Sequence, residues 1–430
     1  MSVDNELKKE HFQELKKNTR YNYQIADFYL DRFQAEGGDI PDEINTPNEL
    51  NKYLSARKHS DKDYSELKRT KWLSKSSNIY NCCKYFDLDT YLKLKIKDVK
   101  RINLCRDKFC LNCQKMMASE RQARFAPQLE ELRKDYEVFH LVLSVPNCSG
   151  EKLLSTIDKM YKAFPHMLKY FKGQGIVKGV DFLAYGYAGA VRGLEITQNE
   201  TTKEFHPHFH SMILFRKGLE LVKTIINPYS YDRGILKNRF SPLEILIQKL
   251  WFLLLNGERV TAKALDELKL GYDCQMSDSA GHYHEVFKYA FKGAFDEDKG
   301  VFLYNEQTFW LLYEAFHNRR MIQGYGLLYN FDECEDIIQA ELDFQYDYII
   351  SVLREIEKPT FRIENLDEVL ERLPFWRYIS KGNLKRVLEG RRAEIEAKHI
   401  LLADKLSDDF FDEPEQTTIF DNKEGNKNNP

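Results

Sequence analysis

The segment FHPHFHSMILF, residues 205–215, decides the architecture expected for this chain of 430 residues. Its apolar residues alternate with histidines and then run on unbroken, which predicts a strand that starts near Pro207. Side chains two residues apart on a strand point to the same face, so His208 and His210 project side by side while Phe209 points into the core. Two neutral imidazoles in this arrangement can share one divalent cation. The alternative is a pair of surface histidines on an exposed sheet face.

A third ligand is expected from the preceding strand, VRGLEIT at residues 191–197. If this strand pairs with the histidine strand as a hairpin through the polar loop 198–205, Glu195 approaches the two imidazoles. A set of two histidines and one carboxylate suits Mg²⁺ or Mn²⁺ and leaves positions open for substrate oxygens.

The elements around this hairpin predict an α+β fold in which helices cover a central antiparallel sheet. A β-rich run at residues 138–145, closed by Pro146 and Asn147, is expected to form the first strand, and residues 272–276 a further short one. Apolar spacing predicts helices at residues 151–172, 243–255, 282–292 and 306–321.

Charge is distributed unevenly along the chain. Although the formal net charge is -3, residues 51–124 contain 19 Lys or Arg and 8 Asp or Glu, whereas the last 30 residues contain 3 and 8. A basic block with an acidic tail fits a protein that meets phosphate on one part of its surface, and the alternative is a solvated helical face. The polar N-terminus and the lack of a run of about 20 apolar residues predict a cytoplasmic protein without a membrane span.

The cysteines of the basic block predict a structural zinc site. Cys105, Cys110 and Cys113 have C-x4-C-x2-C spacing, which can chelate one ion from a tight turn. Tetrahedral zinc needs a fourth ligand, and the adjacent Cys82 and Cys83 cannot easily both face the same ion. We assign Cys83 and leave Cys82 open as its replacement. The alternative is a set of reduced, partly buried thiols.

A tyrosine and a glutamate are expected on one face of the predicted helix 282–292. Glu285 and Tyr289 are four residues apart, and Lys292 follows the tyrosine by three. A tyrosine becomes a useful nucleophile when a metal polarises the electrophile and a cation stabilises the phenolate. A carboxylate one turn away can activate water as a general base. The alternative is an ordinary amphipathic helix with a Glu–Lys surface pair.

Together these motifs resemble those of the Rep proteins of rolling-circle plasmids from Gram-positive bacteria, within the HUH endonuclease superfamily. Glu285 lies four residues before the tyrosine, as in the Rep subgroup in which one Tyr and one Glu both act in the reaction. The resemblance covers about residues 80–330. The segments that carry it are the His-hydrophobic-His motif at 208–210, the first motif LVLSVPN at 141–147, the K-Y-x-x-K motif at 288–292, the upstream cysteine block and the segment FHNRRMIQG at 316–324.

The resemblance implies a replication initiator that nicks and transfers single-stranded or hairpin origin DNA of a plasmid. The nick would be metal-dependent and site-specific, with a 5′-phosphotyrosine intermediate on Tyr289 and termination assisted by Glu285. Origin DNA, a host helicase and host replication proteins are the implied partners, without a membrane. Lys292 is expected to assist catalysis. The cations expected to contact DNA are Lys288, Arg192, Arg106 and Lys108.

Two other functions remain open. A transposase or mobilisation relaxase of the same superfamily often has a second tyrosine on the catalytic helix, whereas Phe287 and Phe291 flank Tyr289 here. A non-catalytic, zinc-stabilised DNA-binding regulator would form no covalent adduct with DNA.

The expected organisation has five parts. They are a helical N-terminal region (1–75), a basic Cys-rich zinc module (76–130), an HUH endonuclease domain with a ferredoxin-like core (131–330), a helical C-terminal region (331–406) and a disordered acidic tail (407–430).

Overall fold

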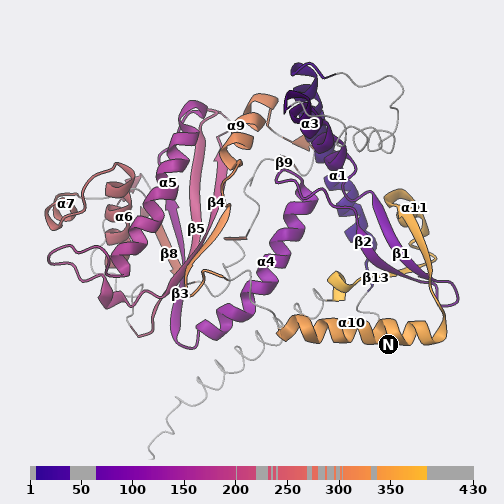
Figure 1. Ribbon diagram of the computed structural model, residues 1–430. Helices are drawn as coiled ribbons and strands as arrows, with labels where there is room; N and C mark the ends of the chain where they lie inside the picture. Colours follow the sequence, from indigo (N-terminus) through magenta and orange to yellow (C-terminus); the bar gives the residue numbers. More distant parts are fainter. Residues whose placement is uncertain are drawn as a thin grey trace, which may run out of the picture.

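The computed structural model describes residues 6–38, 64–199, 201–218, 231–233, 236–238, 241–268, 274–278, 286–287, 295–296, 301–302, 304–330 and 337–384. They form a mixed fold in which two largely antiparallel sheets, of five and four strands, are flanked by helices (Figure 1), and two further sheets have two strands each. The α+β class expected from the sequence is therefore confirmed. No helix within these described ranges has both the length and the apolar composition needed to cross a membrane.

The larger sheet has five strands in the order β11-β4-β5-β3-β8, and every neighbouring pair is antiparallel. Its strands are β3 (Tyr136–Ser144), β4 (Gly189–Gln198), β5 (Phe205–Arg216), β8 (Cys274–Asp278) and β11 (Ile322–Gly326). The predicted hairpin is formed by β4 and β5, and the predicted strands at residues 138–145 and 272–276 correspond to β3 and β8.

One face of this sheet is covered by three helices, α5 (Gly150–Phe171), α6 (Pro242–Leu255) and α9 (Glu306–Phe316). The odd-numbered residues of β5 point to this side, where Phe209 and Ile213 are fully buried in the main core. Helix α6 begins at a capping box in which the Ser241 hydroxyl accepts from the Glu244 backbone N–H. Helix α9 ends earlier than predicted, because Asn318 adopts a left-handed conformation with φ 56°.

The even-numbered residues of β5 point to the opposite face. Here α4 (Leu111–Leu132) covers one end of the sheet, where its Phe125 packs with Met212, Leu214 and Phe287 in a second apolar cluster. The other end of this face carries His208 and His210 in place of apolar residues. The same strand therefore changes from an apolar surface to a polar one along its length.

The smaller sheet has the order β12-β1-β2-β13. It joins β1 (Tyr85–Tyr91) and β2 (Ile96–Ile102) to β12 (Thr360–Asn365) and β13 (Arg377–Ile379), and only β13 pairs in parallel. The region expected to be wholly helical after residue 331 thus contains two strands. Their pairing partners lie about 270 residues away in the sequence. The local pattern of apolar residues carries no information on pairing at that distance, so it does not predict these strands. A buried ion pair between Lys97 and Glu364, 2.6 Å long, ties the two parts together.

Helices α1 (Lys9–Ala35) and α3 (Tyr64–Tyr80) pack against each other and beside the cysteine block, while α10 (Ile337–Ile356) and α11 (Leu366–Arg372) flank the smaller sheet. The remaining elements are η2 (Leu183–Tyr185), β6 (Tyr231–Arg233), β7 (Leu236–Asn238), α7 (Ala262–Glu267), β9 (Phe295–Asp296) and β10 (Val301–Phe302). Most of the predicted helix 282–292 and the whole predicted tail 407–430 lie outside the described residues.

Candidate metal centre

Glu195, His208 and His210 come together on the face of the larger sheet that α5 does not cover. The register of β4 and β5 pairs Glu195 with His208, and His210 follows on the same side of β5. The Glu195 Oε2 atom lies 2.8 Å from His210 Nε2 and 3.3 Å from His208 Nε2. The two Nε2 atoms are 3.1 Å apart. Three donor atoms thus converge on one point, and this group could hold a metal ion.

The other nitrogen of each imidazole has a partner that favours this arrangement. His208 Nδ1 lies 3.2 Å from the backbone carbonyl oxygen of His206. A carbonyl can only accept, so Nδ1 of His208 carries the proton and Nε2 keeps a free lone pair. His210 Nδ1 lies 3.1 Å from Nε2 of a third histidine, His140 on β3. The two rings are stacked, with planes 2° apart.

His140 is a residue that the sequence reasoning missed. It is 7% exposed and pairs with Met212 across β3 and β5, which places it diagonally beside His210. If His140 Nε2 accepts from His210 Nδ1–H, the Nε2 atom of His210 is free to bind metal. The available signal was a histidine within an otherwise apolar run, FHLVL, whose register against β5 the sequence did not provide.

Glu195 is held as a carboxylate. It is 5% exposed, and burial alone would raise its pKa. Hydrogen bonds and charge interactions with His208 and His210 outweigh burial, so the pKa of Glu195 lies well below its usual range. The group therefore offers one carboxylate oxygen and two imidazole nitrogens, a donor set that suits a divalent cation.

Residues 286 and 287 lie on the same face as this group. Val286 and Phe287 are buried in the apolar cluster that also contains Val191 and Met212. The Val286 carbonyl comes so close to Gly193 that a Cβ atom at that position would collide with it. Gly193 is the partner of His210 in the β4–β5 register. The chain therefore passes directly beside the histidines just before residue 288.

The four predicted residues of the tyrosine segment lie outside the described residues, so Glu285, Lys288, Tyr289 and Lys292 remain predictions. Tyr304, which is described, is buried near the group. Burial and the Glu195 charge raise its pKa to about 12, although a backbone hydrogen bond at Gln198 opposes this rise.

A second group of possible metal ligands is formed by Cys82, Cys105, Cys110 and Cys113. The Cys82 sulfur lies 3.5 Å from the sulfurs of Cys110 and Cys113, and Cys105 lies 3.6 Å from Cys113. The fourth residue is thus Cys82 and not the assigned Cys83. Cys83 follows the turn in a left-handed conformation, with φ 61°, and its sulfur contacts only Cys82 among these four, at 3.8 Å.

Each of the four sulfurs accepts an N–H donor. The donors are the backbone N–H groups of Cys105, Asp107 and Arg106 and the side-chain amide of Asn22, which meet the sulfurs of Cys82, Cys105, Cys113 and Cys110 at 3.2–3.5 Å. Such donors stabilise thiolates. Hydrogen bonds among the four thiols lower the pKa of Cys113, with that from Cys105 first, and leave the pKa values of Cys82, Cys105 and Cys110 raised, so the electrostatics of the group alone favour one thiolate among the four. The geometry of the four sulfurs and the four N–H donors to them therefore both fit a bound cation.

Two of the predicted DNA-contacting cations, one buried and one exposed, have structural partners. Arg192 is 2% exposed and points to the face of the sheet opposite the histidines, where its guanidinium lies 4.0 Å from the centre of the Tyr161 ring. It is therefore not available to DNA, and that prediction does not fit the fold. Lys108 donates to the Phe316 carbonyl at 2.8 Å and so links the cysteine block to the end of α9. Arg106 is exposed in the cysteine turn, so its contact with DNA remains a prediction.

The described fold and its two ligand groups define an α+β protein with one candidate metal centre on a sheet and another in a cysteine turn. A family model described as "Replication protein" matches residues 96–220, which include three of the four clustered cysteines and the whole Glu/His/His group. These residues do not include the tyrosine segment.

Three curated relatives, each named "Protein rep", are similar to this chain. One from Staphylococcus aureus is 22% identical over 171 residues, 39% of this chain and 70% of the relative. One from a Bacillus species is 26% identical over 153 residues, 34% of this chain and 45% of the relative. One from Bacillus amyloliquefaciens is 30% identical over 92 residues, 21% of this chain and 24% of the relative. The matches thus span less than half of two of these relatives.

These matches confirm the resemblance to Rep replication proteins of Gram-positive bacteria that the motifs indicated. No solved structure matches the chain.

Proposed function

We propose that this protein initiates rolling-circle replication of a plasmid by nicking single-stranded or hairpin origin DNA with Tyr289. The observation that carries the proposal is the convergence of Glu195, His208 and His210, with the segment that leads to Tyr289 lying against Gly193 beside them. The family match and the names of the relatives support a replication role.

The spacing of the three donor atoms supports Mg²⁺ or Mn²⁺ as the ion. Adjacent ligands of an octahedral ion at about 2.1 Å lie about 3.0 Å apart. The observed separations of 2.8, 3.1 and 3.3 Å bracket that value. Three ligands on one face of an octahedron leave room for phosphate oxygens and water. The bound ion would polarise the scissile phosphate as a Lewis acid.

Chain connectivity supports Tyr289 as the nucleophile. Consecutive Cα atoms are 3.8 Å apart, so the Cα of Tyr289 lies within about 7.6 Å of the Cα of Phe287. Phe287 is buried against Phe125, with 4.9 Å between ring centres, on the histidine side of the sheet. A tyrosine side chain starting within that distance is able to reach the surface that carries the two histidines.

The proposed nick keeps the energy of the broken phosphodiester bond in the new bond between tyrosine and phosphate. The phenol oxygen of Tyr289 forms a bond to phosphorus as the bond from phosphorus to the 3′ oxygen breaks. The phenolic proton passes to solvent, and the released 3′ oxygen takes up a proton to become the hydroxyl that primes synthesis. Lys292 and Lys288 would offset the charge on the phenolate and the phosphate. Attack by another 3′ hydroxyl reverses the step and transfers the strand, so no ATP is required.

We expect Glu285 to act at termination. Its carboxylate would accept a proton from water as the water oxygen bonds to phosphorus and the second 3′ oxygen leaves with a proton. Glu285→Gln should therefore leave the first nick within about threefold of the wild-type rate but reduce the second, hydrolytic cleavage by about 100-fold. Release of unit-length circles from a plasmid substrate measures this step. Normal release by the variant would argue against the role.

His140 is proposed to position His210. His140→Leu removes the acceptor for His210 Nδ1 and should weaken Mn²⁺ binding by about 10-fold to 100-fold. His140→Gln can still accept through its side-chain oxygen and should restore most of the affinity. Titration of Mn²⁺ by electron paramagnetic resonance measures both. Equal losses in the two variants would mean that His140 matters only for packing.

The cysteine group is proposed to hold structural zinc. Sulfurs around a tetrahedral zinc ion at about 2.3 Å lie about 3.8 Å apart, close to the observed 3.5–3.6 Å. Cys110→Ser should release the zinc and lower the free energy of unfolding by about 3 kcal/mol or more. Cys83→Ser, one residue from a ligand, should keep one zinc per chain. Metal analysis of both proteins checks the assignment, and loss of zinc only from the second would reverse it.

The function as a whole is tested by capturing covalent protein–DNA adducts. The protein is incubated with a library of single-stranded hairpins and Mn²⁺, and adducts that survive SDS are sequenced. A replication nickase should retain strands cut at one sequence. A non-catalytic DNA-binding regulator would retain none.

A further inference from the structure

Helix α5 carries a stripe of lysines along its exposed side. Its inner side is apolar and packs on the sheet through residues such as Ile157 and Phe164, both fully buried. The outer side exposes Lys152, Lys159, Lys162, Lys169 and Lys172, with His166 between them. Apart from Lys172, which lies at the helix end, these residues fall within about 100° of the helix circumference.

The stripe has few opposing charges. The acidic residues of α5 are Glu151 and Asp158. Asp158 already pairs with Arg319, whose guanidinium nitrogen lies 2.7 Å from its carboxylate. Among the described residues, no carboxylate forms an ion pair with any of the five lysines. An exposed helix face usually mixes both signs of charge, so five lysines without a carboxylate partner favour a partner that brings negative charge.

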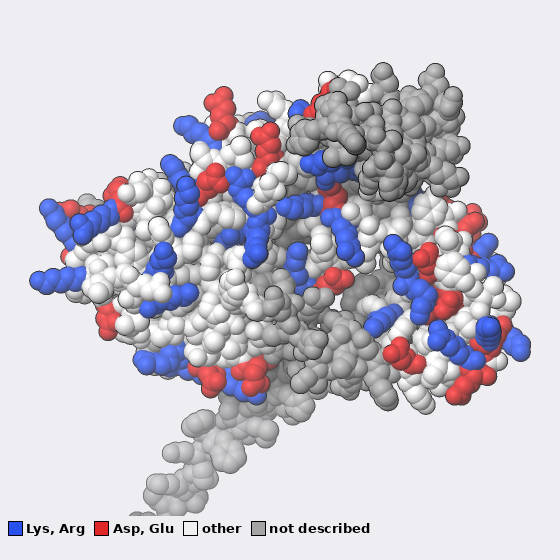
Figure 2. Space-filling view, viewed as in Figure 1, with Lys and Arg blue, Asp and Glu red and all other residues white. Residues whose placement is uncertain are grey.

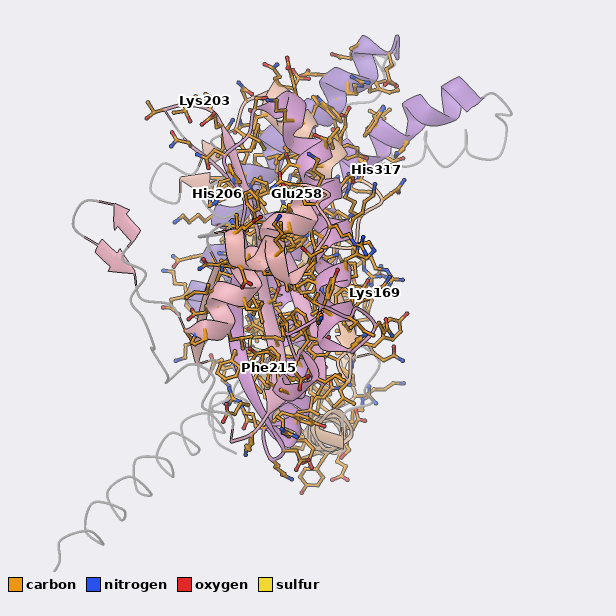
Figure 3. The ribbon with its side chains drawn as sticks, turned by 90° about the vertical axis from the view of Figure 1, so that its left-hand side faces the viewer. Lys169, Lys203, His206, Phe215, Glu258 and His317 are labelled. Atoms are coloured by element: carbon orange, nitrogen blue, oxygen red, sulfur yellow. The ribbon has the colours of Figure 1, made fainter. Side chains whose placement is uncertain are left out.

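The stripe faces away from the Glu/His/His group. In Figure 3, Lys169 is labelled on the right of the molecule, and His206, from the histidine strand, on the left. Figure 2 shows basic side chains over α5 and onward across the middle of the same face. The larger sheet therefore separates the stripe from the candidate metal centre.

We propose that α5 binds the backbone of double-stranded DNA, separately from the single strand at the metal centre. The choice of DNA as partner rests on the proposed function. From Lys152 to Lys172 the helix rises about 30 Å, which corresponds to about nine base pairs of duplex. Lysines of this kind contact phosphates and carry little base specificity, so binding is independent of sequence and sensitive to salt. Duplex next to the origin would thus stay attached while one strand is cut.

The test compares three triple variants on a labelled duplex of about 25 base pairs and arbitrary sequence. Lys159→Gln, Lys162→Gln and Lys169→Gln together should weaken binding about tenfold at low salt. They should also reduce the slope of log affinity against log salt by about 2.7, or 0.9 for each lost phosphate contact. The corresponding Lys→Arg triple keeps the charge and should bind within about twofold of wild type.

The matched control is Lys134→Gln, Lys263→Gln and Lys358→Gln, which removes three exposed lysines outside α5 and outside the basic block 51–124. It should change the slope by less than about 1. An unchanged slope in the α5 triple, or an equal change in the control, overturns the proposal, and the stripe would then serve another anionic partner or only solubility. Cleavage of a ten-nucleotide single strand that carries the cut sequence identified with the hairpin library is followed in parallel and should not change in the α5 triple. Failure of the wild type to cleave it would count against the nickase, while the duplex titration would still decide the role of α5.

Discussion

Tyr289→Phe is expected to abolish the covalent attachment of DNA while leaving DNA binding within about twofold of wild type. Phenylalanine keeps the ring but lacks the oxygen that would bond to phosphorus, and removal of a nucleophile typically costs about 10⁴-fold or more in rate. The measurement is the fraction of a labelled oligonucleotide that migrates with the protein in SDS. Binding is measured separately by fluorescence anisotropy.

Tyr304→Phe is the matched control, because Tyr304 is the described tyrosine whose charge environment includes Glu195. Burial raises its pKa to about 12, which makes its phenolate scarce at neutral pH. The Tyr304 variant should therefore still form the adduct. If Tyr304→Phe removed the adduct and Tyr289→Phe kept it, the nucleophile would be Tyr304 and the proposed role of the tyrosine segment would be wrong.

The second large effect is expected from the metal ligands. His210→Ala removes one of three convergent donors and should weaken Mn²⁺ binding by about 100-fold or more, since changes to partners outside the ligand set already cost 10-fold to 100-fold. Nicking should fall to the level seen with the wild-type protein in excess EDTA. Metal titration and nicking are measured on the same preparation, so that loss of activity can be compared directly with loss of affinity.

His206→Ala is the control for this prediction. His206 lies on the same strand and face and its ring centre is 5.2 Å from that of His208, but it is not one of the three convergent donors. Its backbone carbonyl contacts His208 Nδ1, and alanine keeps that carbonyl. Its Mn²⁺ affinity should remain within about threefold of wild type. Nicking by His210→Ala at the wild-type rate in the presence of EDTA would contradict a metal role for this group.

Local rules predicted the centre of the fold because β4 and β5 follow them closely. Strand alternation placed His208 and His210 on one face, and hairpin pairing brought Glu195 to them, as the register now shows. The same alternation would have corrected the prediction for Arg192. Arg192 lies three positions before Glu195, an odd number, so the two side chains point to opposite faces of the strand.

Features that depend on strands pairing far apart in the sequence could not be predicted from local patterns. His140 reaches His210 only because β3 lies beside β5 in a register set by the whole sheet. Strand β12 pairs with β1 across more than 250 residues, and its own sequence reads equally well as part of a charged helix. The choice of Cys82 over Cys83 depends on a left-handed backbone at Cys83. No glycine lies next to Cys83, so the sequence carries no signal for that conformation.

The most direct test of the central claim identifies the residue that becomes attached to DNA. Adduct formed with Mn²⁺ on a cleavable hairpin is digested with nuclease and protease, and the modified peptide is sequenced by mass spectrometry. The proposal predicts a nucleotide joined through its 5′ phosphate to the oxygen of Tyr289. A nucleotide on another residue, or no adduct although the protein binds Mn²⁺ and the hairpin, would contradict it.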